Sequence, residues 1–293
     1  MTRKLWTQKH DSGPAARLGA AMVYHDSRRR VVLFGGTNFP SLISSDTWEW
    51  DGQYWTEVAD TGPAARSGHA IAYDRARDRT VIFGGESNQG STRFSDTWTW
   101  DGADWTQVAD TGPRPFFRHA MTYDGARQQT VLFGGITSGE TWEWDGTEWK
   151  QVSDDGPSLR GGHAMAYDSV RQRVILFGGQ TTVPTNDTWE WDGKQWSQRA
   201  EFGPPGRSDH AMACGGNRTL MFGGAGFTDT WEWNGVRWVQ IQDMGPSARM
   251  SAPMAYDSAR GRAVLFGGGV LGVAPVGEAP SYQYLRDTWE LAD

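Results

Sequence analysis

The sequence predicts an all-β chain made of six similar four-stranded units, and three observations lead to this prediction. A glycine pair follows a run of apolar residues and Phe six times, from Gly35-Gly36 to Gly267-Gly268, at intervals of 44 to 50 residues. A Trp-rich segment follows each pair, and an Asp-Gly or Asn-Gly dipeptide follows five of these segments. The 38 Gly, 13 Pro and 17 Trp are typical of many short strands joined by turns. A repeat of this length indicates the blades of a propeller.

Each unit divides into four strands, a to d in chain order, as the second unit illustrates. Strand a is HAIAYD at residues 69–74, and strand b is TVIFGG at residues 80–85, whose unbroken apolar run suits a strand buried on both faces. Strand c, DTWTW at residues 96–100, alternates Trp with Thr, which is the two-residue period of a strand. Asp101-Gly102 then supplies the positive φ angles of a tight hairpin that leads into strand d.

The sixth unit lacks this hairpin, and the start of the chain supplies what is missing. The chain ends DTWELAD after strand c and begins KLWTQ at residues 4–8, which matches strand d of the other units. We therefore expect residues 4–9 to form the outer strand of the blade that contains residues 250–291. Residues 1–293 would then form a single six-bladed domain whose closed ring has no free sheet edge.

The repeat resembles that of the kelch family of β-propellers. The resemblance rests on the glycine pair after an apolar strand, the Trp of the DTW strand and the second Trp after the hairpin, and it covers residues 4–291. Residues 167–179, YDSVRQRVILFGG, are similar to the form seen in bacterial kelch proteins. The resemblance implies a six-bladed kelch β-propeller with four-stranded antiparallel blades. Kelch propellers include adaptor domains, actin-binding proteins, a mutarotase and copper oxidases, so the resemblance leaves the function open.

Charge and composition exclude several classes of partner. The formal net charge of −7, with no run of Lys and Arg longer than three residues, disfavours nucleic acid and anionic membrane surfaces. MTRKLWTQKH lacks the apolar stretch of a secretory signal, and no segment approaches the roughly 18 apolar residues of a membrane span, so we expect a cytoplasmic protein. The single cysteine, Cys214, excludes an internal disulfide framework and multi-cysteine zinc sites. We expect no cofactor and no metal.

Aromatic residues that the repeat does not explain lie mainly in the loops between strands b and c and between strand d and the next strand a. Because consecutive strands run antiparallel, both sets of loops emerge on one face. Phe116 and Phe117 lie in the d–a loop of the third unit, and Tyr282 and Tyr284 lie in the long b–c loop, residues 269–286, of the sixth. We expect this face to recognise a peptide or a small anionic ligand. The alternative is that these rings plug their own loops.

Arginine and histidine recur near the start of strand a. The third residue after the Pro of each Gly-Pro pair is arginine in five units, namely Arg17, Arg66, Arg160, Arg207 and Arg249. Such a cluster suits a carboxylate or phosphate ligand. We favour the alternative that each arginine pairs with the acidic residue three positions before that Pro, such as Asp60. The third unit instead has Phe116 at this position, beside Arg118.

The sixth residue after the same Pro is histidine in four units, namely His69, His119, His163 and His210. We include these histidines among the candidate ligand-binding residues. We do not expect them to bind a metal, because equivalent positions in neighbouring blades are spread around the channel.

Enzyme motifs are missing from the sequence. It contains no G-x-S-x-G, no phosphate-binding loop of the form G-x-x-x-x-G-K-[ST] and no H-E-x-x-H. We therefore predict a binding scaffold. The alternative is an enzyme of small-molecule metabolism, such as a mutarotase-like isomerase or a cyclase, with its pocket at the mouth of the central channel. Glu140 and Glu278 are the candidate carboxylates in that case.

Overall fold

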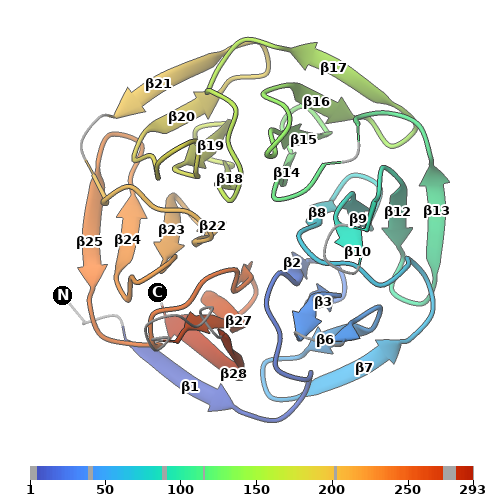
Figure 1. Cartoon of the computed structure of the whole chain (residues 1–293), viewed down its shortest axis with the longest axis vertical. Coiled ribbons are helices and arrows are strands. Elements are labelled where there is room, and N and C mark those ends of the chain that lie inside the picture. Colours follow the sequence, from blue (N-terminus) through green and yellow to red (C-terminus); the bar gives the residue numbers. More distant parts are fainter. Residues whose placement is uncertain are drawn as a thin grey trace.

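The computed structural model describes residues 5–38, 42–87, 91–114, 116–200, 203–272 and 282–292. Within these ranges every regular element is a strand, and six four-stranded antiparallel sheets form a ring around a central channel (Figure 1). The predicted six-bladed β-propeller is therefore confirmed. The described residues contain no helix with the length and hydropathy needed to cross a bilayer.

The strands of blades I to V follow one another in chain order from the channel to the rim. Blade I comprises β2 (Ala21–His25), β3 (Arg30–Phe34), β6 (Thr47–Trp50) and β7 (Trp55–Ala59). Blade II comprises β8 (Ala70–Asp74), β9 (Arg79–Phe83), β12 (Thr97–Trp100) and β13 (Trp105–Ala109). Blade III comprises β14 (Ala120–Asp124), β15 (Gln129–Phe133), β16 (Thr141–Trp144) and β17 (Trp149–Ser153).

The remaining blades have the same order. Blade IV comprises β18 (Ala164–Asp168), β19 (Arg173–Phe177), β20 (Thr188–Trp191) and β21 (Trp196–Ala200). Blade V comprises β22 (Ala211–Gly215), β23 (Arg218–Phe222), β24 (Thr230–Trp233) and β25 (Trp238–Gln242). Blade VI comprises β26 (Met254–Asp257), β27 (Arg262–Leu271), β28 (Tyr282–Ala292) and β1 (Trp6–His10). Two short hairpins, β4 (Thr37–Asn38) with β5 (Leu42–Ile43) and β10 (Glu86–Ser87) with β11 (Thr92–Arg93), extend the b–c loops.

Blade VI joins the two ends of the chain, as the sequence predicts. Strand β1 lies at the rim and pairs antiparallel with β28, with Trp6 opposite Leu291 (Figure 1). The long b–c loop of this blade differs from its expected extent of residues 269–286. Strands β27 and β28 continue their antiparallel pairing beyond the blade, so that Gly269 lies opposite Tyr284 and Leu271 lies opposite Tyr282. Both tyrosines are therefore strand residues.

Neighbouring blades are joined by one hydrogen bond that repeats around the ring. The indole Nε1 of the first Trp in each outer strand donates to a Thr Oγ1 of the preceding blade, over 2.8–2.9 Å. The pairs are Trp55 with Thr288, Trp105 with Thr47, Trp149 with Thr97, Trp196 with Thr141, Trp238 with Thr188, and Trp6 with Thr230. Apolar clusters also cross each boundary, as where Met121 of blade III packs with Ala70 and Ala72 of blade II. The core of the molecule therefore lies between the blades.

Candidate functional site

The five repeated arginines lie buried beneath the d–a loops and bind carboxylates of their own blades. In blade II, the Arg66 guanidinium donates to both carboxylate oxygens of Asp96, at 2.6 and 2.8 Å, and to the carbonyls of Gly84 and Ala64. Burial by itself would raise the pKa of Asp96, but the hydrogen bonds and the charge of Arg66, together with the hydrogen bond from Trp98, outweigh burial and lower it. The other pairs are Arg17 with Asp46, Arg160 with Asp187, Arg207 with Asp229, and Arg249 with Asp287.

This pairing corrects the partner expected from the sequence. The arginine binds the Asp that begins each DTW strand, whereas Asp60, the acid three residues before Pro63, is exposed. The physical reason is that strands a and c of a blade both begin on the face of the d–a loops, because consecutive strands run antiparallel. The guanidinium therefore reaches the carboxylate of its own blade and the carbonyl of the first glycine of the pair, which completes its set of acceptors.

Blade III departs from this pattern at both positions. Phe116 occupies the place of the arginine, is fully buried and lies edge-on to Phe83, with ring centroids 6.5 Å apart. Glu140 replaces the aspartate, pairs with the exposed Arg114 at 3.0 Å and accepts a hydrogen bond from Trp142. An apolar ring thus replaces the buried cation, and the carboxylate finds a cation at the surface.

The four repeated histidines are buried between strand a of one blade and strand b of the preceding blade. His119 Nε2 lies 3.2 Å from the Phe83 carbonyl oxygen, and His163 Nε2 lies 3.1 Å from that of Phe133. Burial lowers the pKa of His69, His163 and His210 to about 3 and that of His119 to about 4. These imidazoles are therefore neutral near pH 7. In the described part of the chain, no group of three or more His, Cys, Asp or Glu side chains could hold a metal ion.

A closed ring of six backbone hydrogen bonds surrounds the channel mouth on the d–a loop face. The fifth residue after each Pro donates its N–H to the carbonyl oxygen of the equivalent residue in the preceding blade, over 2.7–3.1 Å. All six residues have left-handed backbone conformations, with φ between 51° and 66°. We call them the mouth ring: Gly19, Gly68, Arg118, Gly162, Asp209 and Ser251.

Three members of the mouth ring carry side chains where the other three are glycine. Arg118 Nη2 forms an ion pair with Asp209 Oδ2, which also accepts a hydrogen bond from Ser208 Oγ at 3.0 Å. The arginine side chain passes over Gly162, where an added Cβ would lie 2.7 Å from Nη2. The pair therefore links blades III and V across blade IV. Arg118 is a candidate from the sequence, whereas Asp209 and Ser251 are not, although the loss of glycine before strand a is visible in the repeat.

The loop aromatics fall into separate groups. Phe94 and Phe227 stack on the buried guanidinium groups of Arg66 and Arg207, each 4.0 Å from ring centroid to guanidinium carbon. The Phe117 ring covers Gly68 of the mouth ring. Tyr282 and Tyr284 lie in blade VI, opposite blade III in the ring of Figure 1. Two other aromatic residues of these loops, Phe39 and Phe202, and the candidate carboxylate Glu278 lie outside the described residues.

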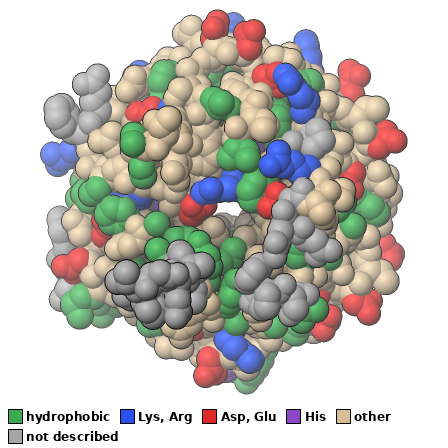
Figure 2. All heavy atoms as spheres, viewed as in Figure 1, with side chains coloured by type: hydrophobic (Ala, Val, Ile, Leu, Met, Phe, Trp, Pro, Cys, Tyr) green, Lys and Arg blue, Asp and Glu red, His purple; other side chains and the backbone are tan. Residues whose placement is uncertain are grey.

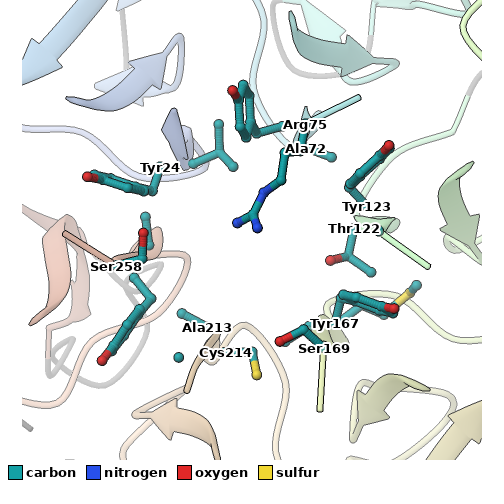
Figure 3. Close-up of a pocket in the computed structure, with 18 of the residues that line it drawn as sticks. Tyr24, Ala72, Arg75, Thr122, Tyr123, Tyr167, Ser169, Ala213, Cys214 and Ser258 are labelled. Atoms are coloured by element: carbon teal, nitrogen blue, oxygen red, sulfur yellow. The ribbon is translucent and has the colours of Figure 1, made fainter. Parts of the chain in front are cut away.

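Two cavities occupy the central channel. Six side chains line both of them: Met22, Ile71, Met121, Met165, Met212 and Met254. The cavity behind the mouth ring has a volume of about 200 Å³ and is lined by all four repeated histidines. The cavity on the opposite face, among the a–b turns, has a volume of about 590 Å³ (Figure 3). The sequence analysis did not anticipate this larger cavity.

Comparison with known proteins does not extend these observations. No protein-family model matches the chain, and no match is found among curated proteins. The six-bladed ring is therefore assigned from its strand pairing. A propeller of this kind is consistent with a binding scaffold.

Proposed function

We propose that the chain is a kelch-type propeller that acts as a binding scaffold and recognises a peptide on the face formed by the b–c and d–a loops. The observation that carries the proposal is the set of three polar side chains in the mouth ring. A residue other than glycine held at positive φ costs on the order of 1 kcal/mol or more, and such residues cluster at functional sites. Arg118, Asp209 and Ser251 all have this conformation.

The Arg118–Asp209 pair offers polar recognition at the centre of this face. Its side chains are 31% and 15% exposed, so solvent reaches them although the pair is partly desolvated. An ion pair of this kind interacts more strongly with a ligand than one that is fully hydrated. Its guanidinium and carboxylate can bind the carbonyl oxygens, amides or charged groups of a peptide.

Exposed apolar side chains surround this polar centre. Six of them, on the b–c or d–a segments, are 43–67% exposed: Leu42, Leu159, Val183, Met244, Leu271 and Tyr282. Figure 2, viewed from the side of β10, shows hydrophobic side chains in several clusters on this face, with charged side chains beside the central opening. Apolar anchors around a polar site are typical of a surface that binds another chain.

The same geometry favours a scaffold over the isomerase or cyclase alternative. A general acid or base needs a pKa near the working pH. The pKa of His119 is lowered to about 4, and its Nε2 lies within hydrogen-bonding distance of a backbone carbonyl. The histidines behind the mouth ring are therefore poorly suited to proton transfer.

The test restores glycine to the mouth ring. In the double variant Arg118→Gly Asp209→Gly, relief of backbone strain compensates for the lost ion pair, so we expect a Tm equal to or above that of the wild type. Peptides selected from a random phage-displayed library on the wild-type protein should bind the variant about tenfold more weakly or worse, which isothermal titration measures.

The matched control removes one cation and one anion from the opposite face, in the double variant Arg79→Gln Asp104→Asn. Both side chains are exposed, so this control should bind the selected peptides with unchanged affinity. Equal binding by the wild type and the glycine variant would refute the proposed site. A failure to select any peptide on the wild type would refute the proposed function.

A further inference from the structure

We propose that the larger cavity, on the face of the a–b turns, is a second binding site, and that Arg75 holds there a small organic carboxylate with an apolar or aromatic body. This site lies on the face opposite the proposed peptide surface. It does not depend on the proposed function.

Most of the residues that line this cavity have apolar or aromatic side chains, and polar groups lie among them. Its volume of about 590 Å³ falls within the range of small-molecule sites. Tyr123 and Tyr167 direct their hydroxyl groups between the blades, where they accept hydrogen bonds from the backbone N–H groups of Ala76 and Ala126. The rings therefore line the cavity, as Figure 3 shows for Tyr24, Tyr123 and Tyr167. Such walls suit the hydrocarbon part of a ligand.

Only two of the described residues that line the cavity, Arg75 and Asp26, are charged at pH 7. Burial raises the pKa of Tyr24, Tyr73 and Tyr167 to about 12. Burial also raises the pKa of the Cys214 thiol to about 11, so these groups remain neutral. Whether the cavity prefers an anionic or a cationic ligand therefore depends on the Arg75 guanidinium and the Asp26 carboxylate.

The guanidinium of Arg75 has donors to spare. Its Nη2 pairs with Asp26 Oδ2, and its side chain is 70% exposed. Figure 3 shows the group pointing to the centre of the cavity. Because a guanidinium carries five N–H donors, a single ion pair leaves an edge that can bind a carboxylate in bidentate fashion. Arg75 is also a departure from the repeat, since no equivalent a–b turn position holds a cation: Asp26, Gly125, Ser169, Gly216 and Ser258.

Asp26 is the weaker candidate for binding a ligand. One of its oxygens receives Arg75, and the other accepts a hydrogen bond from Ser258 Oγ at 2.8 Å. Its side chain is 25% exposed, against 70% for Arg75. The carboxylate thus has a donor on each of its two oxygens, from two neighbouring blades, whereas the guanidinium has one ion pair for its five N–H groups. The imbalance favours an anionic ligand over a cationic one.

The experiment titrates sodium phenylacetate into the full-length protein by isothermal calorimetry, with inorganic phosphate as an oxyanion without an apolar body. Phenylacetate should bind and phosphate should bind at least about tenfold more weakly, because only phenylacetate uses the apolar walls. Arg75→Gln should weaken phenylacetate binding about tenfold or more. Asp26→Asn should strengthen it several-fold, because removing this carboxylate removes its repulsion of the ligand and frees Arg75.

Arg79→Gln is the matched control, because Arg79 begins β9 directly after the same a–b turn of blade II, is exposed and does not line the cavity. It makes the same change in net charge and should leave the affinity unchanged. Absence of phenylacetate binding to the wild type, or equal affinity in Arg75→Gln, would overturn the proposal. Weaker binding in Asp26→Asn would also overturn it, since that result assigns the site to a cation.

Discussion

Among single residues, Arg66 illustrates how this fold tolerates buried charge. Its guanidinium is excluded from solvent, and the charge is matched by the Asp96 carboxylate and by two backbone carbonyls. Removal of one partner from such a pair is costly because it leaves an uncompensated buried charge. The same arrangement recurs in four other blades, so it stabilises the d–a loops beneath the proposed peptide surface.

We predict that Asp96→Asn destabilises the protein by about 3 kcal/mol or more, because Arg66 then lacks its anionic partner. Asp60→Asn should change the free energy of unfolding by less than about 0.5 kcal/mol, since the Asp60 side chain is exposed. Urea unfolding of both variants measures the difference. Similar losses in the two variants would show that Asp60, the partner expected from the sequence, also supports the loop.

At the scale of strands, each blade is attached to the preceding one along its innermost strand. His119, at the start of β14, contacts the Phe83 carbonyl at the end of β9, and the two rings are edge-on with centroids 5.7 Å apart. His163 makes the same contact with Phe133 at the end of β15. Burial keeps these imidazoles neutral, because a charged ring would lose its hydration there, and the attachment of one blade to the next is therefore sensitive to acid.

We predict that stability falls as the pH is lowered below about 6.5. The pKa of the four repeated histidines is depressed to about 3 to 4, so the unfolded chain takes up protons that the native state cannot. The contribution of each histidine to the free energy of unfolding is complete above about pH 6.5. It declines by about 1.4 kcal/mol per pH unit as the pH falls toward the pKa of that histidine in the native state. Tm measured from pH 7 to pH 4.5 should show this decline.

The double variant His119→Gln His163→Gln should have a shallower dependence of Tm on pH, whatever its stability at pH 7. His10→Gln, on the outer strand β1, is the control and should keep the wild-type slope. An unchanged slope in the double variant would mean that other groups cause the acid sensitivity.

At the scale of the whole molecule, the ring is closed by strand β1. Trp6 on this strand donates to Thr230 of blade V and packs edge-on against Phe222, with ring centroids 5.3 Å apart. The outer strand of blade VI therefore also covers the boundary with blade V. Because each blade is stabilised mainly by its neighbours, the loss of one boundary affects the entire ring.

We predict that deletion of residues 2–9 lowers Tm by about 10 °C or more, because it removes most of β1 and exposes the edge of β28. Trp6→Phe retains the strand but loses the indole hydrogen bond and part of the buried ring, which should cost about 1–3 kcal/mol. Differential scanning calorimetry measures the Tm of the deletion variant and of Trp6→Phe. An unchanged Tm after the deletion would contradict a stabilising role for this closure.

The number of blades, the order of their strands and the closure of the ring were predictable from the amino-acid sequence. These features depend on local patterns, namely the apolar run before each glycine pair, the alternating Trp and the Asp-Gly turns. The match of KLWTQ to strand d likewise needed only comparison of one unit with another. Buried strands such as β9 were predictable because an unbroken apolar run has no other stable location in an all-β chain.

The tertiary structure alone decided which polar groups meet. Arg66 and Asp96 are 30 residues apart, and Arg118 and Asp209 are 91 residues apart. The spacing of residues along a chain does not specify how loops from different blades converge on an axis. For the same reason the position of the larger cavity, and the direction of Arg75 into it, could not be read from the repeat. A departure from the repeat indicates where to look, but only the folded ring shows which side chains it brings together.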